Sequence, residues 1–274
     1  MTSRLPTVFL PHGGGPWTIV DLGPMTSELD PLRVYLERLT KELPEAPKAV
    51  LCISAHWEAP KATVMTAPTP PMLYDYYGFP PASYEYVWPA KGAPEVAEKV
   101  VDHLQSAGID YARDAERGFD HGTFVPMMIP DPRGEIPTFQ LSLVQGLDPK
   151  THIDIGRALA PLRDEGVLIV GSGMSYHNMR AFGAAMRSPN GRGPMQADAL
   201  RFDDWLAELT TRSESEIEQR LIEWERAPAG RAAHPREEHL LPLMVVAGAG
   251  LGDTVSRPFE GSMLGAKISA TAFG

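Results

Sequence analysis

Cysteine is nearly missing from this chain, with one in 274 residues, and its scarcity excludes two kinds of protein. Cys52 alone cannot form an intrachain disulfide framework or a thiolate-rich metal site. Signals for export and for membrane insertion are also missing. Residues 1–15 lack the apolar core of a signal peptide, and no run of about 18 apolar residues is present. We therefore expect a soluble protein of the reducing cytoplasm that does not bind membranes.

Positive charge is scarce as well. The chain has 25 Lys and Arg residues against 35 Asp and Glu residues, which gives a formal net charge of -10. Without a basic face, we do not expect nucleic acid as a partner. The glycine-rich stretch 13–15 lacks the Lys-Ser/Thr pair of a phosphate loop and the spacing of a dinucleotide fingerprint, which argues against ATP and NAD enzymes. A small neutral or aromatic ligand remains open.

Strand-like and helix-like patterns alternate along the chain, which predicts one α/β domain over residues 1–274, with a central mixed sheet flanked by helices. Strands are predicted at 7–10, 49–54, 138–143 and 167–171, and helices at 32–43, 95–107 and 153–163. Two surface helices are predicted in 195–226 after a polar stretch at 187–193, a further helix over 237–249, and closing strands in 255–269. The stretch 60–89, dense in proline and aromatic residues, is predicted to be a long ordered loop with its rings packed inward.

Six of the eight histidines occur where apolar segments run into glycine, proline or small residues, at positions 12, 56, 121, 177, 234 and 239. Imidazoles delivered by several separate elements are typical of a buried transition-metal site. His12 and His56 follow two predicted core strands, and the carboxyl ends of such strands form the ligand crevice of open α/β sheets. We predict that these two residues lie together. His103 and His152 occupy ordinary polar or amphipathic segments and are predicted to lie on the surface.

Two further histidines are candidates for proton transfer or substrate contact. His121 follows Asp120, whose carboxylate is expected either to orient an imidazole or to cap the next helix. His177 comes after the small-residue turn at 171–173, beside the predicted crevice. It is a candidate general acid/base, with a hydrogen bond to backbone as the structural alternative.

The segment 234–239 holds three possible metal ligands, His234, Glu238 and His239. If a helix begins near Pro235, Glu238 and His239 point about 100° apart and do not easily face one metal. The spacing leaves the choice open.

A hydrolase is a rival interpretation, because His-Gly-Gly-Gly at 12–15 also opens the oxyanion loop of lipase-type enzymes. Those enzymes need a Gly-x-Ser-x-Gly elbow, and none occurs in this sequence. Two histidines and a carboxylate around an open-sided metal are instead the arrangement of non-haem Fe(II) oxygenases.

The chain resembles the class III extradiol ring-cleavage dioxygenases, in the branch of 4,5-DOPA dioxygenase-like proteins. The resemblance runs through five motifs in order: PHGGGPW (11–17), ISAHWE (53–58), FDHGTFVPM (119–127), GSGMSYHN (171–178) and HPREEHLLPLMVVAGA (234–249). One departure is the stretch His12-Gly-Gly-Gly-Pro-Trp17, where related members commonly read His-Gly-Ser-Pro.

The resemblance implies a metal site and an activity. His12 and His56 would be metal ligands, with Glu238, His239 or His234 as the third. The metal would be Fe(II), with Zn(II) often found in its place. His177 would be the acid/base and His121 would bond substrate or dioxygen. The expected partners are a catecholic substrate, O₂ and a second copy of the chain in a homodimer. The alternative within this fold is a non-catalytic zinc-binding protein.

Overall fold

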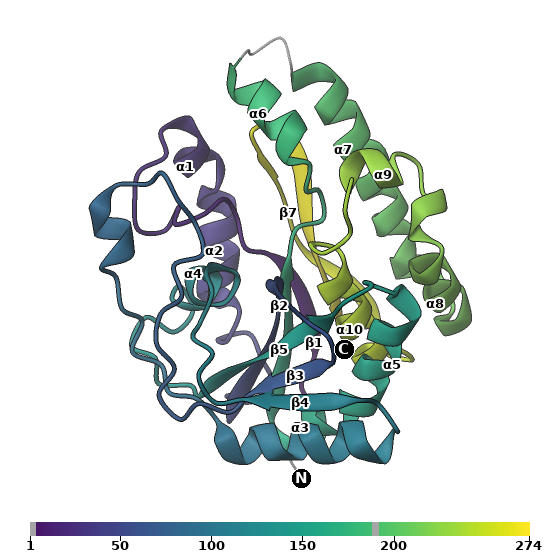
Figure 1. Ribbon diagram of the computed structural model, residues 1–274. Coiled ribbons are helices and arrows are strands. Elements are labelled where there is room, and N and C mark those ends of the chain that lie inside the picture. The colour runs from purple at the N-terminus through teal and green to yellow at the C-terminus, as the bar shows by residue number, and fades with distance from the viewer. Residues whose placement is uncertain (1–3, 188–191) are drawn as a thin grey trace.

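The computed structural model describes residues 4–187 and 192–274, which fold around one eight-stranded sheet with helices on both faces (Figure 1). The strands are β1 (Thr7–Pro11), β2 (Ala49–Ala59), β3 (Ala62–Met65), β4 (Tyr111–Asp114), β5 (Thr138–Val144), β6 (Val167–Gly173), β7 (Val255–Met263) and β8 (Ala266–Phe273). The helices are α1 (Pro24–Glu28), α2 (Asp30–Arg38), α3 (Pro94–Ser106), α4 (His121–Met127), α5 (Pro149–Leu159), α6 (Met179–Arg187), α7 (Arg192–Ala207), α8 (Glu214–Ile222), α9 (Gly230–Ala233) and α10 (Leu241–Gly250). The predicted α/β class with a mixed sheet is confirmed.

The strand order places four parallel strands in the middle of the sheet. The order is β4-β3-β5-β2-β6-β1-β8-β7, and β5, β2, β6 and β1 all run in the same direction. The last two strands, β8 and β7, run antiparallel and close the sheet. Because the central strands are parallel, their carboxyl ends lie on the same side of the sheet. The segments that follow β1 and β6 leave the sheet at these strand ends.

The core lies on both faces of these strands. β6 is buried throughout and β2 is buried except at His56 and Glu58, as expected for strands covered on two sides. α10 is buried along its whole length and packs between α5 and the sheet, while α2 and α4 lie on the opposite face (Figure 1). None of the described helices is both long and apolar enough to cross a bilayer.

Several predicted boundaries differ from the structure. β2 continues past residue 54 to Ala59, so His56 lies within the strand rather than after it, next to an irregularity in the pairing with β5. β3 falls inside the stretch predicted to be a loop, because four residues between prolines give too short a pattern to detect. β4 was also missed, since its residues are polar and only partly buried at the sheet edge. Part of the polar stretch 187–193 lies outside the described residues.

His152 and His103, both predicted to lie on the surface, are more buried than expected. His152 is fully buried rather than on the surface, because α5 turns it toward the end of β5. Its Nδ1–H donates to the Asp148 carbonyl at 2.8 Å, and its Nε2 accepts from the Val144 N–H at 3.1 Å. His103 is half-buried beside Glu165.

Candidate metal centre

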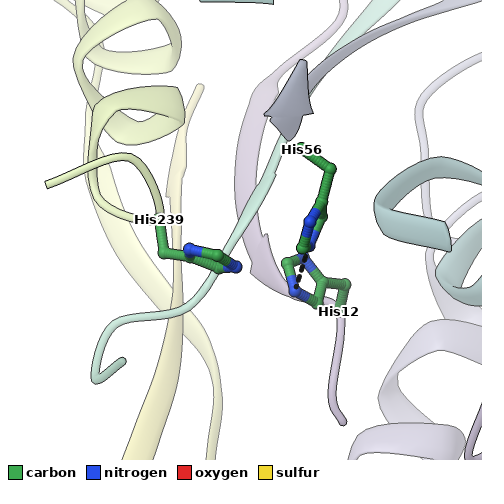
Figure 2. Close-up of side chains that lie close together, drawn as sticks. All are labelled: His12, His56 and His239. Carbon is green, nitrogen blue, oxygen red and sulfur yellow. Dashed lines mark hydrogen bonds between the residues drawn. The ribbon is translucent and has the colours of Figure 1, made fainter. Parts of the chain in front are cut away.

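Three imidazoles from separate segments face one common space (Figure 2). His12 directly follows β1, His56 lies in the second half of β2, and His239 belongs to the turn that precedes α10. The Nε2 atoms of His12 and His56 are 3.3 Å apart, and one nitrogen from each of the three rings lies within 4.8 Å of the others. The Nε2 of His239 is buried without a hydrogen-bond partner among the described residues. The predicted pairing of His12 with His56 is therefore present, with His239 beside them.

Short backbone contacts hold these segments at the sheet edge. The His12 N–H donates to the Gly173 carbonyl at 3.0 Å, which extends the pairing of β1 with β6 by one residue. The Trp17 indole N–H donates to the His12 carbonyl at 2.8 Å. On the other side, the His239 carbonyl accepts from the Met174 N–H at 3.0 Å. A Cβ atom on Gly173 would lie 2.2 Å from that carbonyl oxygen, so only glycine lets the turn approach β6 this closely.

The orientation of the His12 ring is set by a buried serine. The Ser172 hydroxyl donates to the Gly122 carbonyl, and its oxygen accepts the Nδ1–H of His12 at 3.3 Å. This leaves the lone pair on His12 Nε2 free to face His56. Gly122 itself is tightly enclosed, since a Cβ there would lie 2.6 Å from Ser54 Oγ and 2.8 Å from His56 Cδ2.

Glu238 lies between His239 and His177 rather than among the three facing nitrogens. Its Oε1 accepts the Nδ1–H of His239 at 2.9 Å and is 3.5 Å from the Nδ1 of His177. The two imidazole rings are stacked, with centroids 3.4 Å apart and planes 14° from parallel. Burial opposes ionisation here, but contacts with His177 and Arg236 hold the pKa of Glu238 below its usual range. Glu238, His177 and His239 also form a second group with metal-ligand spacing.

Asp75 lies between His121 and His56, as Glu238 lies between His239 and His177. Its Oδ1 accepts both the Nδ1–H of His121 at 2.7 Å and the backbone N–H of His121 at 2.9 Å. Its Oδ2 is 3.5 Å from the Nδ1 of His56. Although burial opposes it, hydrogen bonding to His121 and the nearby imidazole of His56 hold the pKa of Asp75 below its usual range. Each carboxylate, Asp75 and Glu238, therefore lies between one of the three clustered histidines and one further histidine.

Asp75 was not found from the sequence. The only signal was an isolated acid within a proline-rich and aromatic stretch. The sequence pointed instead to Asp120, which occupies the N-cap position of α4 but makes no side-chain cap. The carboxylate of Asp120 accepts hydrogen bonds from Ser54 and Gln140 at 2.6 Å and from Arg117 at 2.8 Å. It therefore neither caps the helix nor orients His121.

Burial keeps the clustered imidazoles neutral. Burial, reinforced by the neighbouring His56 and His239, holds the pKa of His12 well below its usual range. The same cause lowers the pKa of His239 well below its usual range and that of His56 to about 3. Neutral imidazoles with unshared lone pairs are the form that binds a metal ion.

His234 is separate from the cluster. It is fully buried between Phe202 and Trp224, and its Nε2–H donates to the Ser175 carbonyl at 3.1 Å. Burial lowers the pKa of His234 to about 3. In the segment that follows His234, α10 begins at Leu241 and not near Pro235. Residues 235–240 form bends and turns, so the helical spacing predicted for Glu238 and His239 does not apply.

The cluster opens into a cavity of about 610 Å³. Its polar lining consists of the five histidines 12, 56, 121, 177 and 239 together with Asp75. The remaining side chains are apolar or aromatic and come from α1 and the segment before it, residues 76–79, α6, and the end of β7 with the turn that follows. Trp17 is not in the lining. Both residues predicted to act beside the metal, His121 and His177, therefore share one cavity with His12 and His56.

The chain is similar in sequence and in fold to known proteins. The family model of the catalytic LigB subunit of aromatic ring-opening dioxygenase matches residues 6–269. A dioxygenase of Hapsidospora irregularis is 35% identical over 270 residues, covering 96% of this chain and 83% of that protein. The 4,5-DOPA dioxygenase extradiol of Beta vulgaris is 37% identical over 250 residues, covering 89% and 86%. The crystal structure of an uncharacterized protein from Escherichia coli K12 has a TM-score of 0.75 and 30% identity, covering 99% of this chain and 100% of that one.

Proposed function

Since the chain belongs to the LigB family of aromatic ring-opening dioxygenases, we propose that it cleaves a catecholic substrate with O₂ in a reaction that depends on non-haem Fe(II). The cleavage is extradiol, next to the two hydroxyl groups, and the product is a muconic semialdehyde. The observation that carries this proposal is the convergence of three neutral imidazoles on the wall of a cavity that also holds His121 and His177.

We assign the metal to His12, His56 and His239. The separation of 3.3 Å between His12 Nε2 and His56 Nε2 is short enough for both nitrogens to bind one ion. The buried Nε2 of His239 has no protein partner and would gain one in a bound ion.

The carboxylates support the histidines in this assignment. The Nδ1 atoms of His12 and His239 are hydrogen-bonded to Ser172 and Glu238, and that of His56 lies 3.5 Å from Asp75. Metal-bound histidines are commonly oriented in this way through the second ring nitrogen. Glu238 is therefore a supporting residue in our proposal, and the third ligand is His239. Three protein ligands leave coordination positions open toward the cavity.

Bound Fe(II) would supply the Lewis acidity that favours the catecholate and the redox chemistry that joins it to O₂. His177 accepts a proton from a catechol hydroxyl, because its ring borders the cavity next to His239. Glu238, 3.5 Å from the His177 Nδ1, stabilises the imidazolium that results. His121 gives its Nδ1–H to Asp75, which leaves Nε2 free to accept a hydrogen bond from the substrate. The apolar walls keep water from the reacting ring.

The proposal is tested by loading the protein with Fe(II) anaerobically and adding air-saturated buffer with each of a panel of catechols. The panel includes DOPA, because the name of the Beta vulgaris relative refers to it. We expect O₂ uptake in step with a product that absorbs in the visible range. Protein loaded with Zn(II) should give neither. If the iron-loaded protein gives no uptake and no colour with any catechol, the proposed activity is wrong.

A matched control is His103→Gln, which replaces a histidine remote from the cavity. This variant should retain turnover and metal content, whereas His12→Gln should lose both. Equal losses in the two variants would contradict the assignment of His12.

A further inference from the structure

The cavity contains no positive side chain to receive a charged substrate. Among the described residues that line it, none is Lys or Arg. Two guanidinium groups lie near the histidine cluster, but both are already paired with carboxylates. Arg117 binds Asp120 at 2.8 Å, and Arg236 binds Glu58 through two contacts of 2.6 Å. An anionic group inside the cavity would therefore lose its hydration without gaining a counter-ion.

The one charged group in the lining is also engaged. Asp75 is held by His121 and His56, as described above, and cannot serve a substrate ammonium without giving up those contacts. The Tyr76 hydroxyl donates to the Ser83 carbonyl. The polar surface of the cavity is therefore concentrated at the histidine end, where a catechol diol would be recognised.

The rest of the cavity is apolar out to its mouth. Met179 and Met186, one on each end of α6, are 63% and 62% exposed, and Tyr77 on the facing loop is 91% exposed. Met25 and Met263 complete this wall. Methionine side chains are flexible and polarisable, so they adapt to apolar groups of different shape. A volume of about 610 Å³ falls within the roughly 300–1,000 Å³ of sites that hold drug-sized ligands, and it leaves room beyond a bare catechol ring.

On these grounds we infer that the substrate is an uncharged catechol with an apolar substituent, and that the cavity selects against catechols that carry a carboxylate. This inference rests on the proposed function and specifies the substrate class of the same site. The physical cause is the partial loss of hydration, because a carboxylate that gives up water without gaining a cationic partner is penalised more than an ester or alkyl group. The diol lies at the histidines, and the substituent extends between α6 and residues 76–79.

The test compares 3-(3,4-dihydroxyphenyl)propanoate with its methyl ester, which lacks the negative charge and adds one methyl group. Two methylene groups separate the carboxyl group from the ring, so the acidity of the diol is nearly the same in both. We expect kcat/KM for the ester to exceed that for the acid by about 10- to 100-fold, mainly through KM. Equal values, or a preference for the acid, would overturn the inference.

Binding to protein loaded with Zn(II), measured anaerobically by calorimetry, separates the inference from the proposed function. If the ester binds more tightly than the acid but neither is consumed by the iron-loaded protein, the activity is wrong and the selectivity stands. If both are consumed without preference, the selectivity is wrong and the activity stands.

A variant at the mouth adds the missing charge. Met179→Arg places a guanidinium at an exposed position of α6, where it does not disturb the core. It should lower the ester-to-acid ratio of kcat/KM by about tenfold or more, while Met179→Leu should keep the ratio of the parent protein. Met186→Arg repeats the experiment on the same face of α6, about two turns further along. An unchanged ratio in both arginine variants would contradict the proposed position of the substituent.

Discussion

The roles assigned to Glu238 and His239 predict a clear order of metal affinities. Structural sites with four ligands bind zinc with a free energy of about 10–16 kcal/mol. Divided equally among the ligands, this is about 2.5–4 kcal/mol for each. His239→Ala removes one of the three facing nitrogens and should weaken metal binding by about 10²–10³-fold. Glu238→Gln keeps an oxygen that can accept the Nδ1–H of His239 and loses only the charge of a 2.9 Å hydrogen bond. Glu238→Gln should therefore weaken metal binding by about tenfold. Loss of a group that hydrogen-bonds a metal ligand typically costs about 10- to 100-fold, and this variant keeps the hydrogen bond.

The assay is competition for Zn(II) against a chelator of known affinity, because zinc is not oxidised during the measurement. The matched control is Glu237→Gln, the same change of charge one residue away. Glu237 is paired with Arg231 at 2.5 Å and does not contact the histidines, so its replacement should leave metal affinity unchanged. If Glu238→Gln instead releases the metal as completely as expected for His239→Ala, while His239→Ala retains it, the third ligand is the carboxylate and our assignment is refuted.

Three further predictions follow from the same geometry. His177→Gln should lower turnover by about 10²–10⁴-fold with metal content preserved; loss of metal in elemental analysis would make His177 a ligand. Gly122→Ala should lower the free energy of unfolding by roughly 1–3 kcal/mol and weaken metal binding, because its Cβ would lie 2.6 Å from Ser54 Oγ and 2.8 Å from His56 Cδ2; unchanged urea denaturation and metal titration would contradict this. Metal-free protein should lose stability as pH falls from 6.5 to 5.5, since the fold lowers the pKa of His56 and His234 to about 3 and the unfolded chain takes up the protons. Each of these two histidines lowers the free energy of unfolding by about 1 kcal/mol over that interval. If urea denaturation gives the same stability at pH 6.5 and 5.5, this explanation is refuted.

The fold was largely predictable because its core strands are short, apolar and bounded by breakers. The pattern at 167–171 corresponds to β6, and the pattern at 7–10 corresponds to β1. Prediction failed where tertiary contacts and not local pattern decide the structure. β4 is polar and pairs only with β3, and the helix expected from residue 237 begins at Leu241 because the preceding turn packs against Gly173 of β6.

Burial of single histidines was equally hard to predict. His152 looks unremarkable in the sequence and His234 looks like a possible metal ligand, yet the first is hydrogen-bonded at the end of β5 and the second is enclosed by aromatic rings. Both contacts join residues in different elements, so neither leaves a periodic signal along the chain.

The sequence alone was enough to predict the kind of chemistry that we propose for this site. Its histidine motifs, its single cysteine and its lack of nucleotide-binding patterns pointed to a nitrogen-rich metal centre in an α/β fold, and the order of five motifs pointed to a family of dioxygenases that the comparisons support. Only the tertiary structure decided which side chains face one another. A side chain's direction depends on the backbone around it, and the turn at 235–240 directs His239 toward His12 and His56 while it places Glu238 beside His177. The pairing of Asp75 with His121 joins residues 46 positions apart, and only the folded chain brings them together.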